Sequence, residues 1–159
     1  MIKGVKIYKN TIFKDKRGYL WTSWKKNQKY KIYFNHDKFS ISKKNVFRGL
    51  HYDNKTWKLI SCVYGEIFLI IVNCDKKSKD YLKAFSIKLN HKKNVQVLVP
   101  PNFANGHLCL SKNCVFHYKL SYKGNYSDVK NQKNIKWNDK RISVKWPIKQ
   151  KLILSSRDK

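Results

Sequence analysis

The stretch WKLISCVYGEIFLIIVNC, from Trp57 to Cys74, decides the fold class of this chain. Its first half reads as a β-strand from Trp57 to Tyr64, and Gly65 then marks a turn. The second half, Glu66 to Cys74, is a nearly unbroken apolar run of strand length, which is typical of a strand buried on both faces. The stretch therefore predicts two consecutive strands inside a β-protein.

Other strand-like segments lie on both sides of this pair, with turn residues between them. They are expected within 2–13 and at 19–24, 30–34, 39–42, 48–52, 81–89, 95–99, 103–110 and 114–122. No amphipathic helix of about ten or more residues is expected. The spacing predicts an all-β, antiparallel sandwich or barrel of the jelly-roll kind, and residues 1–159 are expected to form a single domain because no repeat or linker divides them.

The charge of the chain is strongly positive, with 36 Lys and Arg against 9 Asp and Glu and a formal net charge of +27. Such a charge is one signature of nucleic-acid binding. The lysines are nevertheless spread along the whole chain rather than clustered in one stripe, so we expect no nucleic-acid partner. The same field favours anionic small molecules such as nucleotide diphosphates.

The four cysteines (Cys62, Cys74, Cys109 and Cys114) each fall in an apolar or strand-like segment and form no Cys-x-x-Cys pair. We interpret them as reduced and buried side chains, which is typical of a cytoplasmic protein. No apolar run is long enough to span a bilayer, and no secretory leader is expected, so no membrane partner is predicted.

A first candidate site residue is His51, in the segment Arg48-Gly49-Leu50-His51 between two strand-like runs. It is a candidate catalytic base, although a core or surface histidine fits the same pattern. Arg48 and His51 have opposite parity, so a regular strand directs them to opposite faces. Gly49 between them is the natural place for a bulge that breaks this rule, and both arrangements stay open here.

Period-two alternation nominates further side chains. In the last long strand the apolar parity is shared by Cys114, Phe116, Tyr118 and Leu120, so Tyr118 should point inward and His117 outward. Lys58 shares a face with Ile60 and Cys62, which fits either a cation in a pocket or a lysine on an edge strand. Asn105 and His107 share a face. Their side chains either reach the same cavity or form hydrogen bonds with backbone groups of a loop.

Six short motifs then occur in order along the chain. They are Phe13–Gly18, Lys43–His51, Pro101–His107, Trp137–Asp139, Trp146–Pro147 and Leu154–Asp158. With these motifs the chain resembles the nucleotide-sugar 3,5-epimerases, whose type member acts on dTDP-4-dehydro-6-deoxyglucose. The stretch from Pro100 to Tyr126 resembles a branch that acts on GDP-4-keto-6-deoxy-heptoses for bacterial capsules. The resemblance implies a cupin-type jelly roll (a double-stranded β-helix), no cofactor, and a homodimer that exchanges N-terminal strands.

The resemblance also implies roles for single residues. His51 resembles the base, Asp158 the carboxylate that orients it, Tyr118 the acid on the opposite face of the sugar, and Lys58 the cation that stabilises the enolate oxygen. The implied substrate-binding residues are Arg17, Arg48, His36, Lys38, Asn105, His107 and Arg157. Among them Arg17 and Arg48 resemble the ligands of the diphosphate, with Arg17 reaching across the dimer.

Four positions depart from the rhamnose-pathway pattern. Asn105 stands where that branch has His, Leu69 where it has Asp, Thr22 where it has Glu, and His36-Asp37-Lys38 replaces Gln-Asp-Asn. These departures lie where nucleotide or sugar recognition is expected, so both a dTDP-linked hexose and a GDP-linked heptose remain candidate substrates. No metal is expected, because a metal-binding cupin needs a His-x-His pair plus a carboxylate on neighbouring strands, whereas His51 is followed by Asp53.

The expected activity is inversion at C3, C5 or both of a nucleotide-linked 4-keto-6-deoxy sugar, by proton abstraction next to the ketone. A 3,4-ketoisomerase on the same scaffold and a catalytically silent sugar-nucleotide-binding cupin are the alternatives. The presence of both His51 and Tyr118 favours the epimerase, since a silent protein predicts the loss of one of them.

Overall fold

The computed structural model describes residues 2–26, 30–127 and 130–159. The strands are β1 (Lys6–Lys9), β2 (Phe13–Asp15), β3 (Gly18–Leu20), β4 (His36–Lys43), β5 (Phe47–Tyr52), β6 (Trp57–Tyr64), β7 (Glu66–Asn73), β8 (Ala84–Asn90), β9 (Val95–Val99), β10 (Phe103–Cys109), β11 (Asn113–Ser121) and β12 (Lys133–Asn134). A single turn of 3₁₀ helix, η1, covers Ser156–Asp158.

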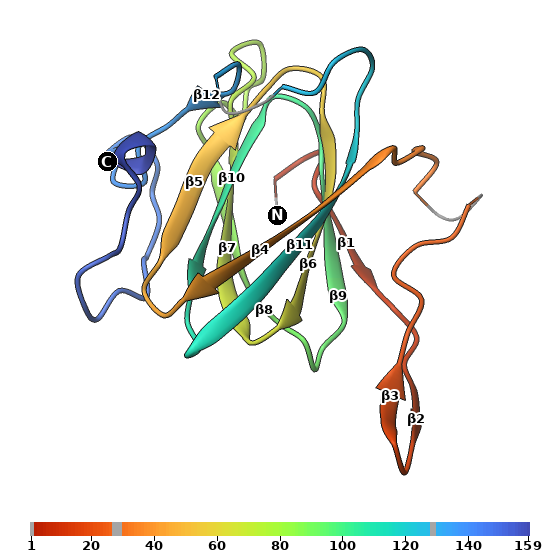
Figure 1. Ribbon diagram of the computed structural model, residues 1–159. Coiled ribbons are helices and arrows are strands. Elements are labelled where there is room, and N and C mark those ends of the chain that lie inside the picture. The colour runs from red at the N-terminus through yellow and green to blue at the C-terminus, as the bar shows by residue number, and fades with distance from the viewer. Residues whose placement is uncertain (1, 27–29, 128–129) are drawn as a thin grey trace.

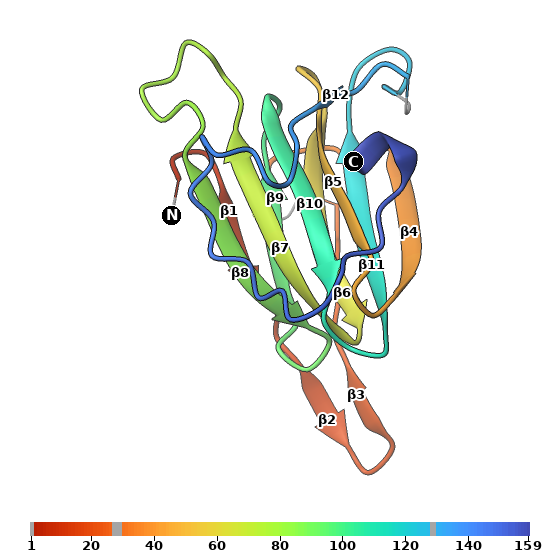
Figure 2. The ribbon, with the colours of Figure 1, turned by 90° about the vertical axis from the view of Figure 1, so that its left-hand side faces the viewer.

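Two five-stranded sheets face each other, as Figure 1 shows. One has the order β1-β9-β6-β11-β4 and the other the order β12-β5-β10-β7-β8, with antiparallel pairing between all neighbours. The hairpin of β2 and β3 forms a separate two-stranded ribbon that projects from the sandwich (Figures 1 and 2). The architecture is the antiparallel jelly roll that the strand spacing predicts.

The two faces of β7 explain its unbroken apolar sequence. Ile67, Leu69 and Ile71 are buried in the core between the two sheets, where they pack with residues of β6, β9, β10 and β11. Phe68 and Ile70 are buried on the opposite face of the same strand, in a second apolar cluster. The prediction of a strand buried on both faces is confirmed.

The C-terminal segment, from Ile135 onward, covers this second face. It runs across β5, β10, β7 and β8 in Figure 2 without forming a sheet of its own. The apolar side chains of this segment pack onto Phe47, Phe68 and their neighbours. The side chains of the segment that do so are Ile135, Trp137, Ile142, Val144, Trp146, Ile148, Leu152 and Leu154. A parallel bridge between Val46 and Ile153 fixes the end of the segment beside the start of β5.

The segment 30–34 was predicted as a strand, and this prediction is wrong, because it makes no ladder in the structure. Tyr30 and Phe34 are instead buried on the outer face of the other sheet, against Leu59 and Leu98. An irregular segment that covers a sheet carries the same apolar residues as a strand, and this explains the error.

Several strand boundaries also differ from the predictions. The strand expected at 19–24 ends at Leu20 as part of the projecting hairpin, and that expected at 81–89 begins at Ala84, because the backbone of Leu82 has a left-handed φ of 64°. The two-residue strand β12 was not predicted. Within the described ranges, no helix is long and apolar enough to cross a membrane.

A β-bulge at Gly49 resolves the parity question on β5. On the partner strand β10, Asn105 pairs with His51 and His107 pairs with Arg48, so three steps on β5 oppose two on β10. The backbone of Gly49 has a φ of +131°, and a Cβ there would lie 2.4 Å from the Cα of Gly106. The bulge turns both Arg48 and His51 toward the interior.

We therefore expect Gly49→Ala to destabilise the fold by at least about 2–3 kcal/mol, from backbone strain and from steric overlap with Gly106. Gly18→Ala is the matched control, because Gly18 has a similar φ of +135° and nothing within 4 Å of its Cβ position. Urea unfolding followed by circular dichroism measures both variants. Equal losses of unfolding free energy would show that the close approach of Gly49 and Gly106 is not limiting.

Candidate active site

A cavity of about 560 Å³ opens between the two sheets. Strands of both sheets line it, together with the C-terminal segment. The lining residues are Lys38, Ser40, Arg48, His51, Lys58, Asn105, His107, Phe116, Tyr118, Tyr126, Gln132, Ser155, Ser156, Arg157 and Asp158. All four residues predicted as catalytic, and five of the seven predicted as substrate-binding, belong to this set.

The closest charged contact in the cavity joins His51 to Asp158. His51 Nε2 lies 2.7 Å from Asp158 Oδ1, and the Asp158 side chain is only 3% exposed. An ionised carboxylate only accepts hydrogen bonds, so the pairing places the imidazole proton on Nε2 and leaves the lone pair of neutral His51 on Nδ1. The arrangement suits a base that is held and oriented by a carboxylate.

Asp158 is held by a short network at the end of the C-terminal segment. Ser155 Oγ donates to Asp158 Oδ2 at 2.8 Å, and the Gly49 amide also donates to the carboxylate. Burial alone would raise the pKa of Asp158, but these hydrogen bonds and that of His51 together lower the pKa below its usual value. The carboxylate is therefore ionised at neutral pH.

Lys58 crosses the cavity from β6 to the opposite sheet. Its ammonium Nζ lies 2.7 Å from Asn105 Oδ1 on β10 and 3.3 Å from the His51 carbonyl oxygen on β5. The residue is 6% exposed, and burial lowers the pKa of Lys58 to about 8. Of the two interpretations of Lys58, the pocket cation is confirmed, since β6 lies inside its sheet and not at an edge.

Tyr118 points into the cavity from β11, on the face shared with Phe116, as its parity predicts. Burial raises the pKa of Tyr118, which keeps its hydroxyl protonated and able to donate. His117 lies on the other face of β11, as its parity predicts, but that outer face is covered at this point. His117 is 5% exposed, stacks on Phe39, and its Nε2 lies 2.8 Å from Asp37 Oδ1.

His107 and Arg48 lie next to each other in the β5–β10 pairing. The His107 ring stacks on Phe116 with centroids 4.2 Å apart, and burial lowers its pKa to about 3, so the imidazole is neutral. Its Nε2 is buried without a hydrogen-bond partner among the described residues. Arg48 also lines the cavity; it donates from Nε to Ser42 Oγ at 3.0 Å and from a terminal guanidinium nitrogen to the Ile41 carbonyl oxygen at 3.5 Å.

The rim of the cavity contains residues that the sequence did not nominate. Tyr126 lies under the Lys38 ammonium, 4.7 Å from Nζ to the ring centroid, and burial raises the pKa of Tyr126 to about 12. Gln132 accepts from Arg157 at 3.4 Å. Both lie in the irregular segment after β11, where alternation carries no signal, and only the position of Tyr126 at the end of a family-like motif could have indicated it.

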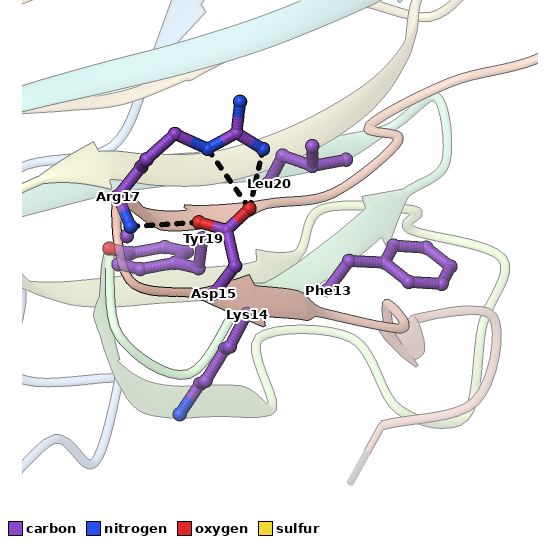
Figure 3. Close-up of a pocket in the computed structure, with 7 residues that line it drawn as sticks. Phe13, Lys14, Asp15, Arg17, Tyr19 and Leu20 are labelled. Atoms are coloured by element: carbon purple, nitrogen blue, oxygen red, sulfur yellow. Dashed lines mark hydrogen bonds and ion pairs between the residues drawn. The ribbon is translucent and has the colours of Figure 1, made fainter.

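Two predicted substrate-binding residues lie outside the cavity lining. His36 contacts Tyr126 from behind, with centroids 4.8 Å apart, and its Nδ1 lies 3.0 Å from the Tyr122 hydroxyl. Arg17 lies at the tip of the projecting hairpin, 81% exposed at the side chain and paired with Asp15 (Figure 3). Their roles in binding remain predictions.

The sequence predicted no metal site because Asp53, and not a second histidine, follows His51. The Asp53 carboxylate caps the following turn by accepting from the Lys55 and Thr56 amides, at 2.9 Å and 2.7 Å. In the three described ranges, no group of three or more His, Cys, Asp or Glu side chains could hold a metal ion.

Comparison with protein families matches residues 1–159 to the model of dTDP-4-dehydrorhamnose 3,5-epimerase. The dTDP-4-dehydrorhamnose 3,5-epimerase of Salmonella typhimurium is 34% identical over 167 residues, which covers 99% of this chain and 88% of that protein. The enzyme of the same name from Escherichia coli K12 is 33% identical, with 99% and 88% covered.

Solved structures show the same likeness. The chain superposes on the dTDP-6-deoxy-D-glucose-3,5-epimerase of Legionella pneumophila, determined in complex with dTDP-4-keto-L-rhamnose, with a TM-score of 0.92 and 29% identity over 99% of this chain and 86% of that one. The dTDP-4-dehydrorhamnose 3,5-epimerase of Bacillus anthracis, with TDP and pyrophosphate bound, gives a TM-score of 0.89 and 28% identity over 98% and 91%. The cupin-type jelly roll is thereby confirmed.

Asp158→Asn is expected to lower the free energy of unfolding by about 1–3 kcal/mol at neutral pH, because the charged hydrogen bond to His51 is lost. The pKa of Asp158 is lower in the folded protein than in the unfolded chain. Its contribution is therefore present above the unfolded pKa and is lost as the pH falls through the folded pKa.

Unfolding by urea between about pH 7 and about pH 2 should show the gap between wild type and Asp158→Asn closing on the acid side. Asp75→Asn is the control, because the Asp75 carboxylate lies in a half-exposed turn and, within the described ranges, accepts only from the Lys77 amide. A gap that stays constant with pH would contradict an ionised, buried Asp158.

Proposed function

The chain belongs to the dTDP-4-dehydrorhamnose 3,5-epimerase family and is an isomerase, and from this premise we propose that it inverts C3, C5 or both of a nucleotide-linked 4-keto-6-deoxy sugar. The observation that carries the proposal is the placement of three groups around one cavity. The His51–Asp158 pair comes from one sheet and the C-terminal segment, whereas Tyr118 and Lys58 come from the opposite sheet.

The chemistry follows from the ketone at C4, which acidifies the hydrogens on C3 and C5. The C–H bond breaks, the proton passes to His51 Nδ1, and the electron pair moves onto the C4 oxygen as an enolate. The Lys58 ammonium stabilises that oxygen. Tyr118 then donates its hydroxyl proton to the other face of the same carbon, the C4 carbonyl re-forms, and exchange with water restores His51 and Tyr118.

Positive charge at the cavity supports a diphosphate-linked substrate. Arg48, Lys38 and Arg157 line the cavity, and guanidinium groups bind phosphate oxygens in bidentate geometry. Tyr126 adds aromatic surface at the same rim, which can stack on a nucleobase, and His36 packs against the Tyr126 ring from outside the cavity lining. These residues are proposed to bind the nucleotide half of the substrate.

The finer proposal is a GDP-linked 4-keto-6-deoxy-heptose of bacterial surface polysaccharide synthesis, with the dTDP-linked hexose of the family name as the competing substrate. It is supported by the departures at Asn105 and Lys38, which line the cavity, and at His36, which packs against Tyr126 of the lining. The expectation that Leu69 and Thr22 also lie in the pocket is wrong, because Leu69 is buried in the core between the sheets and Thr22 is exposed outside the cavity lining.

The position of Tyr118 distinguishes the epimerase from the two alternative functions, the 3,4-ketoisomerase and the silent binding protein. A 3,4-ketoisomerase can work on one face of the sugar, and a silent binding protein needs no acid at all. The Tyr118 hydroxyl has no hydrogen-bond partner in the described part of the chain, and it lies in the sheet opposite His51. This placement favours inversion, which needs a proton donor across the ring.

A homodimer with exchanged N-terminal strands is proposed for the functional form. Arg17 lies away from its own cavity, on a hairpin whose large apolar side chains are exposed, with Phe13 and Leu20 each 60% exposed. Exposed apolar residues on a projecting element support an interface. A second copy could receive the hairpin and use Arg17 as its diphosphate ligand. The four cysteines are free and buried, which supports a reducing, cytoplasmic compartment.

The function is tested by proton NMR in deuterium oxide, with dTDP- and GDP-linked 4-keto-6-deoxy sugars that include a heptose. Deuterium should appear at C3, C5 or both of one substrate, and His51→Asn should abolish this exchange while the circular dichroism spectrum is kept. Tyr118→Phe should retain some exchange but lose most of the inversion, because the base survives and the donor does not. Absence of exchange with every substrate would favour the silent binding protein.

Subunit mixing tests the exchange of strands. Arg17→Ala and His51→Asn proteins, each inactive alone, are unfolded together and refolded in equal amounts. If Arg17 serves the partner's cavity, each mixed dimer has one intact site, and about a quarter of wild-type activity should return. If Arg17 serves its own cavity, no mixed site is intact and activity stays at the level of the separate variants.

A further inference from the structure

The buried contact between Lys58 and Asn105 is unusual because it pairs a charged group with a neutral one. A lysine ammonium that is 6% exposed is held by a neutral amide, at 2.7 Å, rather than by a carboxylate. Buried ammonium groups ordinarily pair with an anion, because desolvation of an unpaired charge is costly. The buried Asp53 carboxylate favours the charged form from nearby without a hydrogen bond to Lys58, since its Oδ1 accepts from the amides of Lys55 and Thr56 and its Oδ2 has no hydrogen-bond partner among the described residues.

The contacts with Asn105 and with the His51 carbonyl leave one N–H donor of the Lys58 ammonium available. A lysine ammonium has three N–H donors and no acceptor, so the atom of Asn105 that faces it must be the amide oxygen. Two donors are used, one on Asn105 Oδ1 and one on the carbonyl oxygen of His51. The structure describes no third acceptor, and Lys58 lines the cavity. The third donor is left for a ligand.

We infer that Asn105 is a positioning residue, which holds the Lys58 ammonium with its third N–H aimed at the ketone oxygen of the substrate. The inference rests on the proposed function for the identity of that oxygen. A carboxylate at position 105 would neutralise the ammonium before substrate arrived. A neutral amide fixes the direction of the ammonium and leaves its charge for the enolate, where it is needed in the transition state.

The pairing of strands makes this orientation rigid. Asn105 lies directly opposite His51 across the β5–β10 ladder, so the amide that holds Lys58 and the proposed base are fixed by the same backbone pair. Lys58 reaches them from the other sheet, and its contact with Asn105 joins the two sheets at the cavity. A shift of Asn105 would move the ammonium relative to the imidazole.

The protonation of Lys58 gives a direct readout. Burial lowers the pKa of Lys58 to about 8, and the charges of Asp53 and Cys74 act in the opposite direction. The other titratable groups that line the cavity are Lys38, Arg48, His51, His107, Tyr118, Tyr126, Arg157 and Asp158. The hydrogen bond that Lys58 donates to Asn105 Oδ1 favours the charged form of the lysine, so a substitution at position 105 should raise or lower the Lys58 pKa according to the charge and acceptor that it introduces or removes.

The experiment measures the Lys58 pKa by NMR of protein labelled with ¹⁵N and ¹³C in lysine side chains, and Lys58→Met assigns the signal. Asn105→Asp should raise the pKa by about 1–3 units, because a carboxylate replaces the amide. Asn105→Leu should lower it, because the acceptor is lost. Asn113→Asp makes the same chemical change at an exposed position at the start of β11, and should leave the pKa of Lys58 unchanged.

This readout does not depend on activity, so it separates the inference from the proposed function. Unchanged Lys58 pKa values in both Asn105 variants would overturn the inference even if the wild type is an epimerase. Conversely, the predicted shifts would leave the contact standing if no sugar is turned over.

Where exchange is observed, the kinetics must also agree. Both Asn105→Asp and Asn105→Leu should reduce kcat by about 10-fold or more with a smaller change in KM, because the interaction is made with the enolate. The alkaline limb of the pH–rate profile should follow the Lys58 pKa, with activity lost as the pH rises through about 8 in the wild type. A loss confined to KM would show that Asn105 only binds ground-state substrate.

Discussion

The close approach of Gly49 to Gly106 is the constraint on which the cavity depends. A side chain at position 49 would overlap the β10 backbone, so only a glycine allows β5 to bulge at this point. The bulge turns Arg48 and His51 to the same side, although they are three residues apart, and the Gly49 amide donates to Asp158. One backbone irregularity thus supplies a cation, an imidazole and an anchor for its carboxylate.

The cavity carries more positive than negative charge, because, over the described ranges, its carboxylate is paired and its cations are not. Asp158 is satisfied by His51, Ser155 and the Gly49 amide, whereas the cations Lys58, Arg48 and Lys38 contact only neutral groups among the described residues. Lys58 is buried, Lys38 is half-buried and Arg48 is exposed at the cavity, so this excess of positive charge favours an anionic ligand there. The overall charge of +27 adds to this preference at long range.

Alternation predicted the parts of the structure where strands are regular. The parity of β11 placed Tyr118 inside correctly, and the apolar run of β7 correctly indicated burial on both faces. It failed where apolar residues cover a sheet without pairing, as at 30–34, and it carries no information on the cover that buries His117 on the outer face. Periodicity cannot join His51 to Asp158, because 107 residues separate them and the C-terminal segment is irregular, so that pairing came only from the family resemblance.

The covering C-terminal segment also has a consequence for the order of folding. Asp158 reaches His51 only after the preceding segment has packed across β5, β10, β7 and β8 (Figure 2), since its last bridge joins Ile153 to Val46. Contacts of such long sequence separation carry a large loop-closure cost and tend to form late. A nascent chain in which all strands from β1 to β11 have formed would still lack Asp158 as the partner of His51. If the His51–Asp158 pair transfers the proton, as proposed, that ability would appear only in molecules whose core is already closed, and activity would depend on completed folding.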